Sequence, residues 1–207
     1  MNAAVKTPEI PEEDRLRADM YDFLGALLAA PPNKALLAQT AALEADDSVL
    51  GQAIGAMARV AKAVSPVAVE GEFTNLFIGL GRGELLPYAS FYLTGFLNEK
   101  PLASLRKDMK ALHITRAPNR FEPEDNMASL CEMMAGMIRG RFGAPVPIAR
   151  QEAFFNRHIA PWAQHFFADL ETAQNSVFYA AVGATGSAFM EIEREAFRMS
   201  AGQAPHM

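Results

Sequence analysis

Histidine and cysteine are the side chains best suited to metal binding or nucleophilic chemistry, and this sequence has few of them. It contains four histidines and one cysteine, Cys131, so a disulfide within the chain and a four-thiolate metal site are excluded. His158 and His165 are seven residues apart and are therefore expected on one helix face, close to Trp162. A metal site needs three or four ligands, and no facing carboxylate can be identified. We interpret the pair as polar residues flanking an aromatic core stripe, and a helical metal- or small-ligand-binding protein is the alternative.

Carboxylates gather at residues 122–125, which read Glu-Pro-Glu-Asp before a helical pattern. Paired carboxylates can bind an arginine guanidinium bidentately, and each charge-assisted hydrogen bond contributes about 1.5–3 kcal/mol. The same residues also suit a helix start, with a capping group, a proline in the first turn and acids at the positive end of the helix dipole. The residues alone favour this structural role, and the two roles can hold together. Further candidate partners for a guanidinium group are Glu70, Glu72 and Glu84.

Residues 81–95, GRGELLPYASFYLTG, form an unusually apolar connection between helical patterns. Connections normally run over the surface and carry polar residues. This one holds Leu85, Leu86, Pro87, Tyr88, Phe91, Tyr92 and Leu93. Two interpretations remain open: the segment fills a gap between helices as a buried loop, or it lines a groove that another molecule enters.

Composition restricts the class of protein further. The chain has 207 residues, of which half are hydrophobic and 21% are charged, with a net charge of −5. These values indicate a folded chain whose main partner is neither nucleic acid nor an anionic membrane surface. No Walker loop, GxGxxG fingerprint or catalytic triad pattern is found, so we expect no enzyme and no cofactor. The N-terminus lacks a secretory pattern, and residues 172–190 are too polar to span a membrane, which predicts a soluble cytoplasmic protein.

Apolar residues recur at helical spacing through most of the chain, and no strand pattern of useful length is found. The expected helices span about 12–30, 33–45, 46–64, 66–78, 102–112, 127–138, 148–170 and 176–199, and Pro161 is expected to kink or restart one of them. The sequence therefore predicts an all-α, single-domain bundle of roughly nine or ten helices over residues 1–207, with flexible tails at about 1–11 and 201–207.

Three segments, taken in order, carry a resemblance to a known family. EFTNLFIGLGRGELLPYASFYLTG, FEPEDNMASLCEMMAGMI and FFNRHIAPWAQHFFADLETAQNSVFYAAVGATGSAFMEIE resemble corresponding segments of the TorD/DmsD/NarJ-type redox-enzyme maturation chaperones. The resemblance extends from roughly residue 18 to residue 195. It implies a TorD-like helical chaperone that binds the twin-arginine signal peptide of a molybdoenzyme precursor and assists cofactor insertion before export.

The resemblance also suggests where the peptide binds. A twin-arginine signal peptide carries a basic pair followed by an apolar stretch, so its site needs an apolar groove with carboxylates at one end. The expected peptide-binding residues are Phe73, Leu76, Phe77, Glu84, Leu86, Pro87, Tyr88, Ser90, Phe91, Glu122, Asp125 and Asn126. Where the family commonly has histidine after aspartate, this chain has Asn126, which keeps hydrogen-bonding capacity but loses a group that titrates near neutral pH. The expected state is a monomer or a helix-exchanged dimer, with the GAPVP segment as a feasible hinge.

Overall fold

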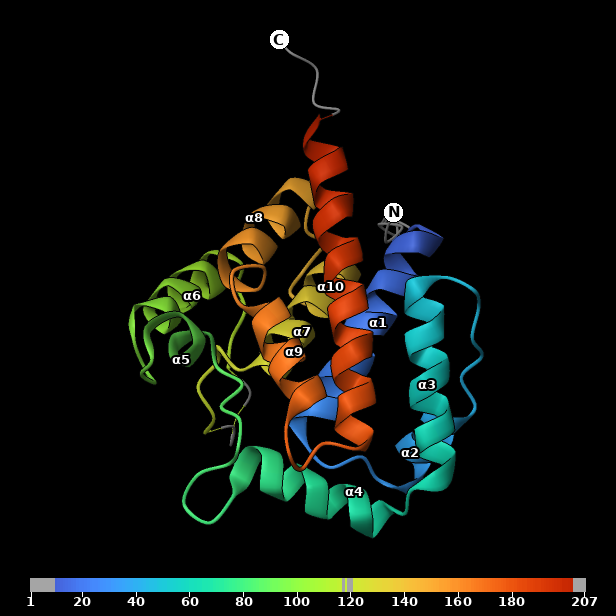
Figure 1. Ribbon diagram of the computed structural model, residues 1–207. Helices are drawn as coiled ribbons and strands as arrows, with labels where there is room; N and C mark the ends of the chain where they lie inside the picture. Colours follow the sequence, from blue (N-terminus) through green and yellow to red (C-terminus); the bar gives the residue numbers. More distant parts are fainter. Residues whose placement is uncertain (1–9, 117, 119–120, 203–207) are drawn as a thin grey trace.

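The prediction of an all-α chain is confirmed. A computed structural model describes residues 10–116, 118 and 121–202, and this part of the chain contains ten α-helices, one π-helical segment and no β-strand (Figure 1). The elements are α1 (Glu12–Ala29), α2 (Lys34–Ala41), α3 (Val49–Ala63), α4 (Pro66–Phe73), η1 (Thr74–Ile78), α5 (Ala89–Thr94), α6 (Lys100–Ala111), α7 (Met127–Arg139), α8 (Ile148–His158), α9 (Ala163–Thr172) and α10 (Phe178–Gly202). Most of the two expected tails lies outside the described residues.

Helix starts follow the capping residues closely. The side chain of Asn33 accepts a hydrogen bond from the Leu36 backbone N–H at 2.9 Å, which confirms Asn33 as the N-cap of α2. The expected start of the third helix at Asp46-Asp47 is wrong, because Ser48 is the N-cap and accepts from the Gly51 N–H at 2.9 Å. Asp46 instead accepts from the Ser48 backbone N–H at 2.9 Å, which shapes the turn before the helix.

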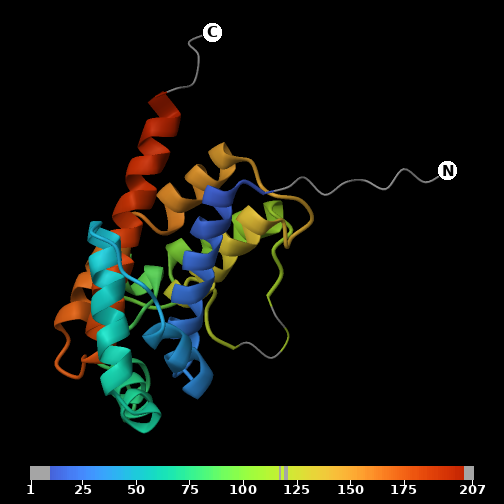
Figure 2. The same cartoon turned by 90° about the vertical axis from the view of Figure 1, so that its right-hand side faces the viewer.

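Two groups of packed helices form the bundle. Helix α1 packs against α7, and α10 packs against both α9 and α3, so the long C-terminal helix lies between these two partners (Figure 1). Helices α5 and α6 lie together on one side, where α6 packs against α8 and Tyr92 of α5 packs against Trp162 and Phe166. Helix α4 crosses the lower end of the bundle (Figures 1 and 2). The four methionines of α7, Met127, Met133, Met134 and Met137, are all buried in the core.

Pro161 interrupts the segment that the sequence pattern treats as one helix. Helix α8 ends at His158 and α9 begins at Ala163, with a turn between them. The expectation that His158 and His165 share one helix face is therefore wrong. His158 is buried, whereas His165 is exposed on the next helix.

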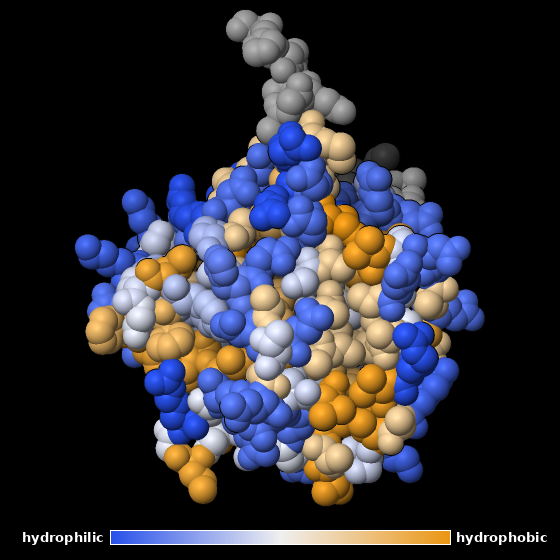
Figure 3. All heavy atoms as spheres, viewed as in Figure 1, coloured by the Kyte–Doolittle hydropathy of each residue, from blue (hydrophilic) through white to orange (hydrophobic). Residues whose placement is uncertain are grey.

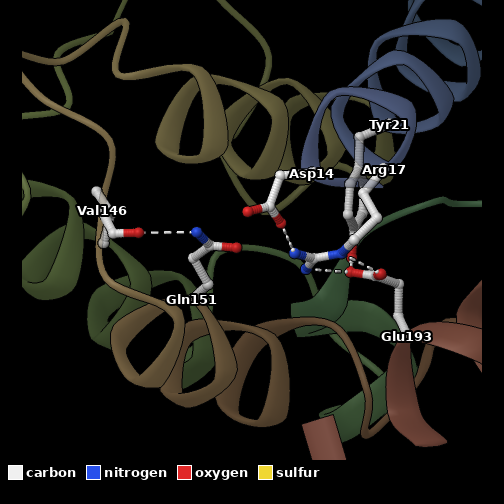
Figure 4. A network of polar contacts seen from close by, with 6 residues as sticks. All are labelled: Asp14, Arg17, Tyr21, Val146, Gln151 and Glu193. Carbon is white, nitrogen blue, oxygen red and sulfur yellow. Dashed lines mark hydrogen bonds and ion pairs between the residues drawn. The ribbon is translucent and has the colours of Figure 1, made fainter. Parts of the chain in front are cut away.

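A buried ion pair joins α1 to α10 (Figure 4). The Arg17 guanidinium donates to both carboxylate oxygens of Glu193, from Nε at 2.7 Å and from Nη2 at 2.9 Å. Tyr21 donates its hydroxyl to the same carboxylate at 3.0 Å, and Asp14 holds the other edge of the guanidinium at 2.6 Å. Glu193 is fully buried, so this bidentate geometry is what satisfies its charge.

Helices α9 and α10 approach closely because two residues of α10 have no side chain. A Cβ atom built on Gly183 would lie 2.8 Å from the backbone oxygen of Phe167 and 2.8 Å from the backbone nitrogen of Glu171. A Cβ atom on Gly186 would lie 2.2 Å from the Phe167 ring. Contacts this short cannot be accommodated without moving one helix, so the two glycines set the distance between α9 and α10.

The outer surface mixes charged and apolar side chains. Figure 3 shows its widest apolar area between the lower halves of α10 and α3. Within the described residues, no helix combines the length and the apolar character that a membrane span requires.

Candidate functional site

A small cavity lies where the ends of α1, the π-helical segment and the start of α7 meet. We call it the apolar groove, and its volume is about 180 Å³. Its lining residues are Leu28, Ala29, Phe73, Phe77, Ile78, Pro87, Tyr88, Glu122, Asn126, Ala128 and Ser129. Apolar side chains form most of this lining, and Glu122 and Asn126 supply polar groups at one side.

The wall formed by α4 and η1 owes its shape to a π-helical turn. Wider helical turns of this kind leave carbonyl groups without their usual partners and are frequent at functional sites. Here the loop that follows supplies the partners: the Glu84 N–H donates to the Asn75 oxygen at 3.1 Å, and the Leu85 N–H donates to the Leu76 oxygen at 2.8 Å. The loop can approach this closely because Gly83 has no side chain; a Cβ atom there would lie 2.6 Å from the Leu76 oxygen.

Contacts between aromatic rings hold the wall formed by α4 and η1 against α10. The Phe77 ring packs edge-on against Phe73 at 5.0 Å and against Tyr179 of α10 at 5.4 Å between centroids. Phe73 is buried and Phe77 is half-buried, while Ile78 is 57% exposed. The groove therefore has a rigid aromatic base and one aliphatic side chain that still faces water.

The opposite wall is a short backbone pairing between residues 87–89 and 125–127. Tyr88 and Asn126 form an isolated antiparallel β-bridge, with the Met127 N–H donating to the Pro87 oxygen and the Ala89 N–H to the Asp125 oxygen, both at 2.9 Å. The Tyr88 hydroxyl also donates to the Glu122 carboxylate, so the aromatic loop and the acidic segment are joined directly. Burial, followed by this carboxylate, raises the pKa of Tyr88 well above its usual value, so Tyr88 acts as a hydrogen-bond donor at neutral pH.

The expectation that residues 122–125 form the first turn of a helix is wrong, because α7 begins at Met127 and has no acidic residue in its first turn. The Asn126 side chain accepts a hydrogen bond from the Ala128 N–H at 2.9 Å, which makes Asn126 the N-cap. Asparagine at this position can serve as a cap and line the groove at the same time. The binding of a guanidinium group by the acidic segment stays a prediction.

Asp125 and Ser90 form a buried pair beside the groove without lining it. Oδ2 of Asp125 accepts from the Ser90 backbone N–H at 2.8 Å and from the Ser90 hydroxyl, while Oδ1 has no partner among the described residues. Both residues are almost completely buried, Asp125 at 1% exposure. Their contacts hold the start of α5 against the start of α7.

Four other expected peptide-binding residues lie away from the apolar groove. Leu76 is fully buried in the core, Leu86 is half-buried outside the lining, and Phe91 packs under the Arg82 guanidinium at 5.1 Å. Glu84 accepts from the backbone N–H groups of Gln174 and Asn175, at 2.6 and 3.2 Å, in the connection between α9 and α10.

Glu72 has a related structural role at the N-terminus of α10. Its carboxylate accepts from three successive backbone N–H groups, those of Val177 at 2.8 Å, Phe178 at 3.1 Å and Tyr179 at 2.7 Å. A carboxylate at this end of a helix satisfies free donors and complements the dipole. Both Glu72 and Glu84 are therefore engaged by backbone groups of the α9–α10 connection.

The structure brings together six of the twelve expected residues: Phe73, Phe77, Pro87, Tyr88, Glu122 and Asn126. Sequence reasoning missed the part of the lining that comes from other helices: Leu28, Ala29, Ile78, Ala128 and Ser129. Leu28 belongs to the apolar stripe of α1, a pattern that predicts burial and cannot distinguish a core position from a groove at the end of the helix.

A second, larger cavity adjoins the apolar groove at Glu122 and Ser129, which line both. We call it the polar pocket, and its volume is about 430 Å³. The rest of its lining is Asp22, Ala26, Met109, Ile114, Thr115, Arg116, Glu124, Glu132, Met133, Arg141 and Phe142. Sequence reasoning did not connect these positions, because they come from α1, α6, α7 and the two loops around α7.

The histidines on α8 and α9 do not form a metal site. His158 Nε2 lies 2.8 Å from the Asp108 carboxylate on α6, so the carboxylate partner that the sequence does not identify lies fifty residues upstream. Arg157 donates to the same carboxylate at 2.8 Å. Across the described part of the chain, no group of three or more histidine, cysteine, aspartate or glutamate side chains is placed to hold a metal ion.

Comparison with known proteins identifies the family to which this chain belongs. A family model described as the nitrate reductase delta subunit matches residues 43–168, a range that runs from before α3 into α9. The chain is 24% identical over 208 residues to the chaperone protein TorD of Aliivibrio fischeri, covering 89% of this chain and 96% of that protein. It is 28% identical over 130 residues to the TorD of Aliivibrio salmonicida, covering 59% of this chain and 60% of that protein.

Among solved structures, the fold is similar to that of a putative redox enzyme maturation protein from Archaeoglobus fulgidus. The TM-score is 0.56 at 18% identity, with 92% of this chain and 99% of that chain covered. The chain belongs to the nitrate reductase delta subunit family, which includes the TorD-type redox-enzyme maturation chaperones. The expected family is therefore confirmed, and it is a family of chaperones and not of catalysts.

Proposed function

We propose that this chaperone binds the twin-arginine signal peptide of a molybdoenzyme precursor in the cytoplasm and retains the precursor while its cofactor is inserted before export. The single observation that carries the proposal is the apolar groove with Glu122 and Asn126 at its polar side. A twin-arginine signal peptide has the matching order of chemistry, a basic pair followed by an apolar stretch. Membership of a chaperone family supports a binding role of this kind.

The size of the groove favours part of an extended segment over a whole small molecule. Its volume of about 180 Å³ is below the ~300–1,000 Å³ of clefts that enclose drug-sized ligands. One or two apolar side chains of a peptide fit such a volume, with the rest of the peptide crossing the surface. Phe73, Phe77 and Pro87 offer the apolar contact, and each apolar side chain that becomes fully buried contributes about 1.5–3 kcal/mol.

Binding of this kind needs no chemical step. By covering the apolar stretch, the chaperone would keep the signal peptide from the export machinery and from aggregation. The helical metal-binding alternative depends on His158 and His165, and no observation favours it, because the two residues lie on separate helices and His158 is engaged by Asp108.

The test is calorimetric titration of the chain with a synthetic twin-arginine signal peptide of a molybdoenzyme, together with a twin-lysine variant of the same peptide. We expect micromolar or tighter binding that weakens when lysine replaces arginine, because an ammonium group cannot make the planar bidentate contact. Equal binding of both peptides would leave the apolar contact and remove the role of the carboxylates. Absence of binding to either peptide would refute the proposed function.

A further inference from the structure

The polar pocket already holds guanidinium groups of this chain. The Arg141 guanidinium faces the Asp22 carboxylate with two parallel contacts, Nη1 to Oδ1 at 2.8 Å and Nη2 to Oδ2 at 2.5 Å. Arg116 donates to the backbone oxygen of Glu122 at 2.5 Å and lies 3.9 Å from the Glu124 carboxylate. Two arginines from two different loops therefore enter one cavity, and each meets acceptors there.

Each of these two arginine side chains is more exposed than the carboxylate that it faces. The Arg141 side chain is 48% exposed and that of Arg116 is 36% exposed, whereas the Glu124 side chain is only 11% exposed. The carboxylates have additional partners: Arg106 donates to Glu124 at 2.8 and 3.0 Å, and Arg139 donates to Asp22 at 3.2 Å. If Arg141 and Arg116 moved into water, both carboxylates would still be paired.

The polar pocket adjoins the apolar groove, and this position indicates which part of a bound peptide would reach the pocket. The two cavities meet at Glu122 and Ser129, so a peptide lying in the groove can continue directly into the pocket. In a twin-arginine signal peptide, the arginines immediately precede the apolar stretch. A peptide whose apolar part contacts Phe77 and Ile78 would therefore place its arginines beyond Glu122, in the polar pocket.

We infer that the polar pocket is a guanidinium site that the free chaperone fills with its own Arg141 and Arg116, and that the arginine pair of the bound signal peptide replaces them. This inference rests on the proposed function and adds to it a self-occupied subsite and a fixed direction for the peptide. Exchange of one arginine for another leaves the hydrogen bonds of the carboxylates nearly unchanged, so the apolar segment supplies the net affinity. The chain's own arginines compete with the peptide, and they select against a peptide without arginine because lysine cannot reproduce the bidentate contact.

The decisive test is removal of the competitor. We expect Arg141→Gln to bind the arginine peptide about 3- to 10-fold more tightly than the unmodified chain, a range typical of one partly exposed ion pair. The matched control is Arg194→Gln on α10, which removes the same charge from a side chain that is 50% exposed and paired with Glu191. The control should change the affinity by less than about twofold. A purely structural role for Arg141 predicts unchanged or weaker binding, and either result would overturn the inference.

A second measurement tests the direction of the peptide. Photo-reactive phenylalanine analogues are placed on the unmodified peptide either just before the arginine pair or at the far end of the apolar stretch. Cross-links from the first position are expected at Met133 or Phe142 of the polar pocket, and cross-links from the second at Phe77 or Ile78. The reverse pattern in a peptide that binds would overturn the inference and leave the proposed function intact. A peptide that does not bind at all would overturn both.

Discussion

Replacement of Ile78 by serine tests the apolar groove at its most accessible point. Ile78 lines the groove from the end of the π-helical segment and is 57% exposed in the free chain. Full burial of such a side chain contributes about 1.5–3 kcal/mol, so the fraction still exposed corresponds to about 0.9–1.7 kcal/mol if the peptide covers it. Loss of that contribution weakens binding by about 5- to 18-fold. Because the side chain is mostly outside the core, the folded state should be retained.

The assay is calorimetric titration of the variant with the signal peptide, beside thermal unfolding of both chains. The matched control is Val67→Ser, which lies on α4 near the other end of the same wall, is 78% exposed and does not line the groove. We expect the control to bind as the unmodified chain does. Equal affinity of the Ile78 and Val67 variants would show that the peptide does not cover Ile78, and the groove would have to be assigned differently.

Two further predictions concern stability. Gly183→Ala is expected to lower the free energy of unfolding by about 0.5–2 kcal/mol, because the cost of displacing α9 exceeds the helix propensity that alanine gains. Gly71→Ala, where a Cβ atom would meet nothing within 4 Å, is expected to raise the free energy of unfolding by about 0.5–1 kcal/mol. Chemical denaturation measures both changes. A Gly183→Ala variant that is more stable than the unmodified chain would contradict the close approach of α9 and α10. Burial lowers the pKa of His158 below its usual value even though the Asp108 hydrogen bond opposes the shift. The unfolded chain therefore takes up this proton first, so stability should fall as the pH decreases below about 6.5, and His158→Gln should reduce that fall. Identical pH profiles for the variant and the unmodified chain would refute the assignment.

Helix positions were largely predictable because local signals determine them. Asn33, Pro66 and Asn126 each stand at or next to a helix start, and the stripe that begins at Met127 faces the core as its spacing requires. Errors occurred where two local signals compete. Asp46 resembles a cap, yet Ser48 is used, because the Asp46 side chain is engaged by the Ser48 N–H.

The site was only partly predictable because half of its lining depends on which helices meet. The link from Tyr88 to Glu122 joins residues that are 34 positions apart. The resemblance to a family placed both residues in one expected site, but the contact between them was not predicted. Charge alone was misleading for Glu84, which has the right chemistry for a guanidinium group but is occupied by backbone donors 90 residues away. A single sequence does not say which carboxylates the fold itself will use.

The attachment of the groove wall to α10 has a consequence for how the groove responds to a ligand. Glu72 and Glu84 lie on either side of the π-helical turn. Glu72 accepts from backbone N–H groups at the start of α10, and Glu84 accepts from backbone N–H groups of the connection that precedes it. These hydrogen bonds hold the groove wall in place in the free chain. If the groove binds a peptide, the wall therefore loses little conformational entropy on binding, and a small cavity can still contribute to affinity. The same contacts tie the position of the groove wall to the start of α10, so a substitution that displaces this end of α10 should also change the shape of the groove.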